Sequence, residues 1–354
     1  MSFRAHARSQ ADACAALGSP FTARLLNLLA DKLRPDTPVA ERLLAWPSDR
    51  AGPDAVALRL AGALHHLVLS GRAPMLARLY AIPETVPDSQ LWRAVNAALR
   101  LHPDVILATL DHAPQTNELR RSAVYIAAAH WLTAAYRLPL VVSELGSAAG
   151  LNLLWDDYAL RIGSQTYGPD GGAITLAPDW KGALPPYAPP LIRSRAGVDL
   201  NPLDPVADRL RLLSYIWPDQ AERMERTARA LDLAAEKRPA VTRANAVDWL
   251  ETRLARPIPQ AVHLVCHTVV WQYLDHADQA RGLDLLARTG ARTRADEPLA
   301  HLAMEDDGTR PGALLTLHLW PGDERIVLGR ADFHGRWVDW HAPPPGGLRN
   351  GLAP

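Results

Sequence analysis

The sequence predicts an α/β fold in which a doubly wound, mostly parallel sheet follows an all-helical amino-terminal domain. Two observations lead to this prediction. A strand–turn–helix pattern occupies residues 140–154, and the spacing of apolar residues changes along the chain. Residues 1–138 contain no convincing strand, whereas residues 314–340 alternate between apolar and polar side chains as strands do. We therefore expect an antiparallel hairpin at the carboxyl-terminal edge of the sheet.

Composition limits the classes of function. The chain has 354 residues, enough for two domains with a sizeable core. Lys+Arg and Asp+Glu both number 38, so no net charge attracts nucleic acid or an anionic membrane. Cys14 and Cys266 match no zinc or redox spacing, which favours a reduced compartment. The start of the chain lacks the pattern of a signal peptide, and the most apolar helical stretch, residues 123–136, is too short to span a membrane. We expect a cytoplasmic protein that binds neither nucleic acid nor membrane.

The first part of the chain, residues 1–138, is predicted to be a helical domain. Apolar residues recur there at helical spacing, and prolines and glycines separate the stretches. The predicted helices cover residues 25–29, 56–67, 89–99 and 117–136. The residues of this domain indicate no particular activity.

The central segment, residues 140–154, reads LVVSELGSAAGLNLL. Its opening apolar run is typical of a buried parallel strand, and Pro139 marks the start of that strand. Gly146 and Gly150 allow a tight turn and a close approach of a ligand to the amides of the following helix, which we expect to end at Leu160. The pattern predicts the first strand–turn–helix of a nucleotide site, although a turn without a ligand has the same pattern.

The glycine spacing identifies which nucleotide site the segment resembles. The pattern Glu-x-Gly-x-x-x-Gly from Glu144 differs from the dinucleotide fingerprint, because Ala148 replaces the middle glycine. It resembles motif I of the class I S-adenosylmethionine methyltransferases, which have a seven-stranded, doubly wound core. The string ELGSAAGLNL also resembles the signature of an uncharacterised bacterial family of unknown function with such a methyltransferase-like, Rossmann-like core. The resemblance implies a core over residues 139–342 and four residues that bind S-adenosylmethionine, Glu144, Gly146, Ser147 and Gly150.

An insertion and a second acidic residue follow. Glycines and prolines separate short β-favouring pieces in residues 160–190, which predicts an inserted hairpin that either covers the ligand or decorates the surface. A short apolar strand then ends at Asp199, where a carboxylate could accept both ribose hydroxyl protons. The resemblance implies this ribose role, and capping of the following loop is the alternative.

Residues 239–250 are predicted to form a strand and a loop that enters a helix. In the methyltransferases the matching loop carries an acidic or amide side chain that binds the adenine amine. Asn245 occupies that place, where the family usually has an acid. Asp248 is either the cap of the helix or a second candidate for the same role.

Residues 261–274 combine a buried strand with a segment that resembles the methyl-transfer face of the superfamily. His267 lies at the predicted strand tip, so it is a candidate general base that contacts substrate together with Trp271 and Tyr273. Core packing is an equally good role for Trp271. His263 and His267 share a face of this strand, yet they lie about 13 Å apart, which excludes one shared metal ion. We therefore expect no metal site.

The carboxyl-terminal third completes the predicted sheet. Residues 299–304 read as an apolar strand, and three alternating segments follow it at residues 314–320, 325–329 and 336–340. An antiparallel hairpin in this region fits the last two strands of a methyltransferase core. The proline- and glycine-rich tail, residues 343–354, should be disordered.

Two functions fit these patterns. The first is a methyltransferase that uses S-adenosylmethionine on a small-molecule or protein acceptor whose identity the sequence does not indicate. Methyl transfer depends mainly on alignment and exclusion of water, so it requires few catalytic side chains. The second is a non-catalytic protein of the same fold that binds a nucleotide-like metabolite or a protein partner, and Ala148 and Asn245 favour it. Ala148 also argues against a nicotinamide oxidoreductase. The oligomeric state is not indicated.

Overall fold

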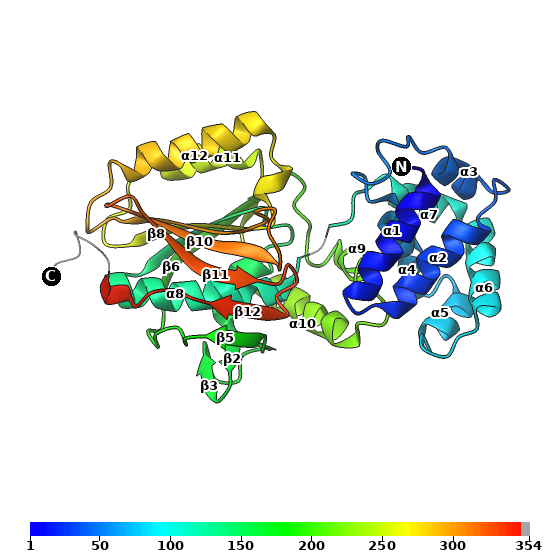
Figure 1. Cartoon of the computed structure of the whole chain (residues 1–354), viewed down its shortest axis with the longest axis horizontal. Helices are drawn as coiled ribbons and strands as arrows, with labels where there is room; N and C mark the ends of the chain where they lie inside the picture. Colours follow the sequence, from blue (N-terminus) through cyan, green and yellow to red (C-terminus); the bar gives the residue numbers. More distant parts are fainter. Residues whose placement is uncertain (116, 348–354) are drawn as a thin grey trace. The chain divides into compact units, whose positions relative to one another are not determined.

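The computed structural model describes residues 1–115 and 117–347, and the chain divides into two compact units. The first unit consists of Met1–Thr116 and Val206–Ala228. The second consists of Asn117–Pro205 and Arg229–Pro354. Each unit is therefore built from two separate stretches of the sequence, and Figure 1 labels their elements. We call them the helical unit and the sheet unit.

The helical unit confirms the prediction that the amino-terminal part consists of helices. Four of its helices begin at a proline, which suits the first helical position because proline lacks the N–H that would have no partner there. The helices are α1 (Phe3–Ala16), α2 (Pro20–Lys32), α3 (Pro38–Leu44), α4 (Val56–Leu69), α5 (Pro74–Tyr80), α6 (Asp88–Leu101), α7 (Pro103–Leu110) and α9 (Arg209–Ser214). The helix α10 (Ala221–Lys237) begins in this unit and ends in the sheet unit.

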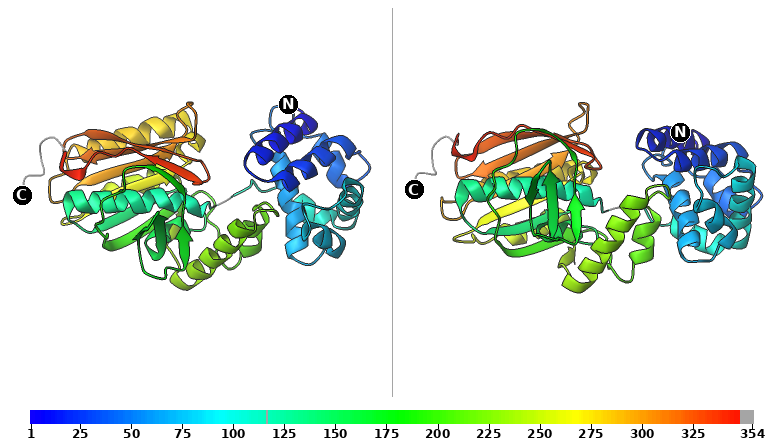
Figure 2. Two further views of the ribbon diagram at one scale, coloured as in Figure 1. Left: turned by 60° about the horizontal axis from the view of Figure 1, so that its bottom comes forward. Right: turned by 90° about the horizontal axis from the view of Figure 1, so that it is seen from below.

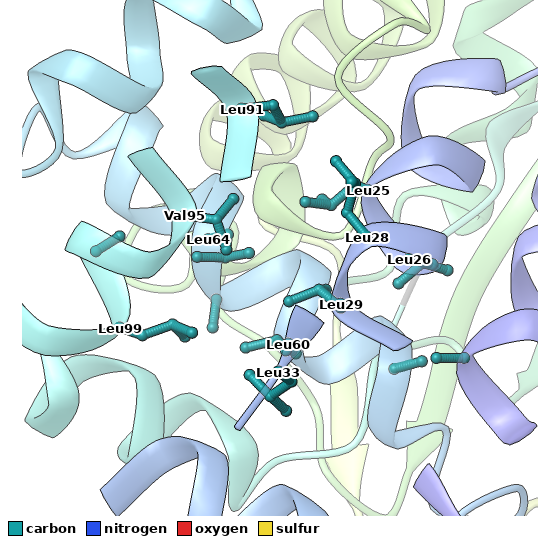
Figure 3. Packing of buried hydrophobic residues seen from close by; sticks show 14 of the residues in the cluster. Leu25, Leu26, Leu28, Leu29, Leu33, Leu60, Leu64, Leu91, Val95 and Leu99 are labelled. Carbon is teal, nitrogen blue, oxygen red and sulfur yellow. The ribbon is translucent and has the colours of Figure 1, made fainter. Parts of the chain in front are cut away.

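Leucines from α2, α4 and α6 form the core of the helical unit, as Figure 3 shows. Leu25, Leu29, Leu60, Leu64 and Leu99 are all at most 1% exposed. Within α2 and within α4 the two named leucines lie four residues apart, so each of these helices turns one apolar face inward. Burial of each such side chain contributes roughly 1.5–3 kcal/mol, which makes these faces the main source of stability in the unit.

Several contacts hold the segment 206–228 against the rest of this unit, and sequence periodicity could not reveal them. The Tyr215 ring covers Gly62, where an added Cβ would lie 2.6 Å from the ring. Nδ1 of His65 lies 2.9 Å from the backbone oxygen of Ile216. The carboxylate of Asp219 accepts a hydrogen bond of 2.9 Å from the backbone N–H of Phe21 and another from the Ser19 hydroxyl. Asp219 thus caps α2, whose own first residues supply no side-chain cap.

The sheet unit contains nine strands in the order β5-β12-β11-β10-β9-β8-β1-β6-β7. The neighbouring strands β9, β8, β1, β6 and β7 pair in parallel. The neighbours β9, β10, β11 and β12 pair antiparallel, and β5 pairs in parallel with β12 at the edge. This confirms an α/β fold with a mostly parallel sheet, although the antiparallel part exceeds the single hairpin predicted. The bounds are β1 (Leu140–Leu145), β5 (Asp179–Gly182), β6 (Ile192–Asp199), β7 (Val241–Arg243), β8 (Val262–Thr268), β9 (Leu299–Glu305), β10 (Ala313–Trp320), β11 (Glu324–Ala331) and β12 (Trp337–Trp340).

Helices cover both faces of this sheet (Figure 1, Figure 2). One face carries α11 (Ala246–Leu254) and α12 (His276–Gly290), and the other carries α8 (Ser122–Tyr136). The predicted boundary at residue 138 differs from the observed division, because α8 belongs to the sheet unit. Every residue of α8 from Ser122 to Leu132 is buried, as expected of a helix that is apolar on all sides and enclosed by its neighbours.

The predicted helix after the central turn is absent. Residues Asn152–Asp157 form a short 3₁₀ turn, η2, and β2 (Tyr158–Ile162) begins directly after it. The helical prediction overlooked that the apolar residues Tyr158, Leu160 and Ile162 recur every second position, which places them on one buried face of a strand. On the other face Ala159 is buried and Arg161 is exposed. The Tyr158 hydroxyl also donates to the backbone oxygen of Leu151 at 2.6 Å, which closes the turn.

The insertion predicted at residues 160–190 contains more than a hairpin. β2 pairs antiparallel with β3 (Gln165–Tyr167) and parallel with β4 (Ile174–Leu176), which makes a separate three-stranded sheet. The next strand, β5, then returns to the edge of the main sheet.

The carboxyl end departs from the predicted disordered tail. Pro345–Gly347 forms a 3₁₀ turn, η4, and the Trp131 indole donates to the backbone oxygen of Pro343 at 2.7 Å. Residues 348–354 of the predicted tail lie outside the described residues. Among the described helices, none has both the length and the hydropathy that crossing a bilayer requires.

We predict that Asp219→Ala loosens α2, because the first turn of the helix loses the acceptor for its Phe21 amide. Loss of an N-terminal cap costs about 1 kcal/mol, so hydrogen exchange of the α2 amides should accelerate roughly fivefold. Mass spectrometry of α2 peptides measures this rate. Asp12→Ala, which removes an exposed carboxylate from α1, is the matched control. Equal α2 exchange in the two variants would contradict the role of Asp219.

Candidate nucleoside site at the strand tips and a histidine cluster

The order of the parallel strands reverses at β1, which has β6 and β7 on one side and β8 and β9 on the other. In open α/β sheets, ligands bind outside the carboxyl ends of the strands at such a reversal. Glu144 and Asp199 lie at the carboxyl ends of β1 and β6, and the backbone of β1 pairs in register with that of β6. The structure therefore brings two of the predicted site residues to neighbouring strand tips.

The glycine turn after β1 has the tight backbone that its sequence predicts. Gly146 and Gly150 have φ of +70° and +72°, in the left-handed region that favours glycine. A Cβ on Gly146 would lie 2.4 Å from Val270, and one on Gly150 would lie 2.8 Å from Pro239. At these two positions, side chains of the protein pack closely against the glycines, where a ligand was expected to do so.

The predicted ribose residue and the turn amides lie in direct contact. Oδ2 of Asp199 accepts a hydrogen bond of 2.9 Å from the Ala148 N–H, and Oδ1 accepts one of 2.8 Å from the Asn201 N–H. Asn117 was not predicted as a site residue, yet its Oδ1 accepts from the N–H groups of Ala149 and Leu151 at 3.0 and 3.3 Å. The N–H groups of this turn are thus arranged to donate to an anion or a hydroxyl. In this structure the side chains of Asp199 and Asn117 accept these hydrogen bonds.

Glu144 is the most unusual titratable group at these tips. Its side chain is 2% exposed, Oε1 accepts from the Tyr125 hydroxyl at 3.2 Å, and Oε2 has no hydrogen-bond partner. Burial raises the pKa of Glu144 to about 7; the hydrogen bond from Tyr125 opposes the rise, and the charge of Asp199 adds to it. Near neutral pH Glu144 can therefore either donate or accept a proton. An unpartnered buried oxygen also marks a place for a donor from a ligand or water.

Ser147 points into the protein. Its side chain is fully buried, and its hydroxyl donates to the backbone oxygen of Glu144 at 3.1 Å. A Cβ added to Gly197 on β6 would lie 2.1 Å from this hydroxyl. Ser147 therefore fixes the turn against β6.

Asn245 and Asp248 hold α11 in place. Asn245 is the N-cap of α11, because its Oδ1 accepts from the N–H groups of Val247 and Asp248 at 2.8 and 3.2 Å. Its Nδ2 also donates to Asp278 of α12 at 2.6 Å. The exposed Asp248 forms an ion pair of 2.5 Å with Arg281. Both side chains thus connect α11 to α12, and the cap is Asn245 instead of Asp248.

His267 lies on the opposite face of the sheet from Glu144. Glu144 contacts Tyr125 of α8, whereas Val265, two residues before His267 on β8, packs against residues of α11 and α12. Side chains two residues apart on a strand share a face. The structure therefore does not bring the predicted base to the side of the sheet on which Glu144 lies.

His267 instead belongs to a buried polar cluster. Its Nδ1 lies 2.6 Å from Oε1 of Glu305, and its Nε2 lies 2.8 Å from Nε2 of His301. The Trp271 ring stacks on His267 with centroids 5.0 Å apart and an interplanar angle of 22°. Tyr273 is 77% exposed and takes no part. His301 and Glu305 were not predicted as site residues, although the His-x-x-x-Glu spacing within β9 places both on one face.

The cluster is neutral at His301 and anionic at Glu305. Burial lowers the pKa of His301 well below its ordinary value, and charges on neighbouring side chains lower it further. Burial opposes ionisation of Glu305, but hydrogen bonds from His267 and from two backbone N–H groups outweigh it and lower the pKa of the carboxyl. Among residues 1–115 and 117–347, no three His, Cys, Asp or Glu side chains are grouped to hold a metal ion.

We predict that Glu144→Gln removes a pH dependence of stability. Because the pKa of Glu144 is raised from 4.5 to about 7, the folded state retains a proton that the unfolded chain has already lost. Stability of the wild type should therefore fall as pH rises through this window and then level off. Above it, the variant should gain up to roughly 3 kcal/mol relative to the wild type.

Urea unfolding of both proteins across this pH window measures the effect. Glu251→Gln, which changes an exposed carboxyl on α11, is the control and should keep the wild-type profile. Parallel profiles for Glu144→Gln and the wild type would show that Glu144 titrates normally.

Comparison with known proteins identifies the family of this chain. The chain matches no curated protein and no solved structure. A family model described as "Uncharacterized protein conserved in bacteria (DUF2332)" matches residues 4–340, which include both units. The chain therefore belongs to this bacterial family, DUF2332.

Proposed function

We propose that this protein is a methyltransferase that uses S-adenosylmethionine and acts on a small-molecule acceptor. The observation that carries the proposal is the 2.9 Å hydrogen bond between the Asp199 carboxylate and the Ala148 N–H. It places the acid at the tip of β6 against the glycine turn at the tip of β1, where the strand order reverses. A nucleoside at this position would meet a carboxylate for its ribose hydroxyls.

The surroundings of Glu144 support the same location. Its buried Oε2 lacks a partner, and its pKa of about 7 allows it to hold or release a proton at neutral pH. When bound, S-adenosylmethionine supplies an electrophilic methyl group. The residues of this chain would then bind the nucleoside through Asp199 and exclude water at the buried strand tips.

A second candidate is a non-catalytic protein that binds a nucleotide-like metabolite or a protein partner. The specific observation in its favour is that side chains of Asp199 and Asn117 already accept from the amides of Ala148, Ala149 and Leu151. The position of His267 on the other face of the sheet also leaves the strand tips without the predicted base.

We predict that S-adenosylmethionine and S-adenosylhomocysteine bind this protein and that Asp199→Ala weakens binding. Loss of hydrogen bonds to a charged group costs about 1.5–3 kcal/mol, so affinity should fall roughly 10- to 100-fold. Titration calorimetry measures both affinities. Asp199→Asn preserves an acceptor for Ala148 and separates loss of charge from loss of the turn.

Asp284→Ala, which removes an exposed carboxylate from α12, is the matched control and should bind as the wild type does. Absence of binding below millimolar concentration in the wild type would support the non-catalytic candidate. Binding that is equal in Asp199→Ala and the wild type would refute the proposed location.

A further inference from the structure

A cavity of about 490 Å³ lies in the sheet unit and is lined by residues of α12 and of strands β8 to β11. This volume falls within the range of small-molecule sites. The cavity is on the face of the sheet opposite the Glu144 side chain, so a ligand in it would not depend on the proposed nucleoside site.

The cavity has its origin in small side chains at the centre of the sheet. His267 of β8 is in register with Ala303 of β9, Ala303 with Thr316 of β10, and Thr316 with Val327 of β11. Side chains in such a row are direct neighbours on one face of the sheet. Alanine and threonine fill little of the space beneath α12, while larger residues stand at both ends of the row.

The walls of the cavity are mostly apolar. Leu283 and Leu286 of α12 line it, and so do the indole rings of Trp271 and Trp320. Aromatic side chains in the lining favour a planar, apolar ligand body, since ring contacts add about 0.5–1.5 kcal/mol beyond burial of area.

The inner end of the cavity presents a hydrogen-bond acceptor. Oε1 of Glu305 accepts from His267 and from the backbone N–H groups of Val270 and Trp271, at 2.6, 2.9 and 3.1 Å. Oε2 of the same carboxylate is buried and has no partner. An ionised carboxylate only accepts hydrogen bonds, so the missing partner must be a donor.

The outer end of the cavity presents a positive charge. Arg325 of β11 lines the cavity and is exposed, and its guanidinium makes no hydrogen bond or ion pair within the part of the chain that the structure describes. The nearby carboxylate of Asp323 is bound to Nε2 of His318 at 2.6 Å. A planar guanidinium suits a carboxylate, which it can bind through two parallel hydrogen bonds.

We propose that this cavity binds a small aromatic carboxylate that carries a hydroxyl group on its ring. The ring packs against Trp271 and Trp320, the hydroxyl donates to Oε2 of Glu305, and the carboxylate pairs with Arg325. The neutral His301 and the bond from His267 keep the Glu305 carboxylate in position.

Three probes test this assignment by titration calorimetry. 4-Hydroxyphenylacetate carries both groups, 4-methoxyphenylacetate lacks the donor, and 4-hydroxyphenylacetamide lacks the charge. We expect the wild type to bind the first roughly tenfold more tightly than either of the others, which corresponds to about 1.4 kcal/mol.

Two variants assign the discrimination to residues. Glu305→Gln keeps an oxygen that accepts from His267 and replaces Oε2 by a donor, so it should lose the preference for hydroxyl over methoxy. Arg325→Gln should lose only the preference for carboxylate over amide. Arg288→Gln, on α12 outside the cavity lining, is the control and should retain both preferences.

A third variant keeps the test decisive if Glu305→Gln fails to fold. Ala303→Leu fills the floor of the cavity and should abolish binding of all three probes while circular dichroism stays unchanged. The proposal is overturned if the wild type binds no probe at millimolar concentration, if it binds all three equally, or if Ala303→Leu binds them as the wild type does.

Discussion

The hydrogen bond between Asp199 and the Ala148 amide is the contact on which the arrangement of the strand tips depends. It joins the turn after β1 to the end of β6, and Asn117 secures the next amides of the same turn. The left-handed glycines 146 and 150 make this turn tight enough for Val270 and Pro239 to pack against it. The proposed nucleoside site is therefore a preformed turn with a carboxylate beside it. A ligand would either replace that carboxylate as the acceptor of the Ala148 amide or bind beside it with the hydrogen bond intact.

The sheet separates two chemically different regions of the same unit. On the α8 face, Glu144 is buried with one oxygen unpartnered and its pKa raised to about 7. On the α11 and α12 face, His267, His301 and Glu305 form a connected cluster in which the carboxylate pKa is lowered. Burial raises the pKa of both carboxyl groups, and the number of hydrogen-bond donors to each decides whether its pKa ends above or below the ordinary value. Glu305 receives three hydrogen bonds at one oxygen, which is enough to keep it ionised.

Local patterns predicted the parts of the fold that depend on neighbouring residues. The continuous apolar run before Glu144, the two glycines of the turn, the apolar run of residues 299–304 and the alternation in residues 314–340 all correspond to observed elements. Features that depend on distant pairing were missed. The inserted segment 206–228 joins the helical unit through Tyr215 and Asp219, and the histidine cluster forms only because β8 and β9 pair in a particular register. The 3₁₀ turn in place of a helix, and the 3₁₀ turn within the tail predicted to be disordered, were local errors.

A crystal structure with S-adenosylhomocysteine would show where a nucleoside binds in this molecule. We expect ribose hydroxyls within about 2.7–3.2 Å of the Asp199 carboxylate, outside the carboxyl ends of β1 and β6. A nucleoside bound elsewhere, with Asp199 still bonded only within the chain, would contradict it.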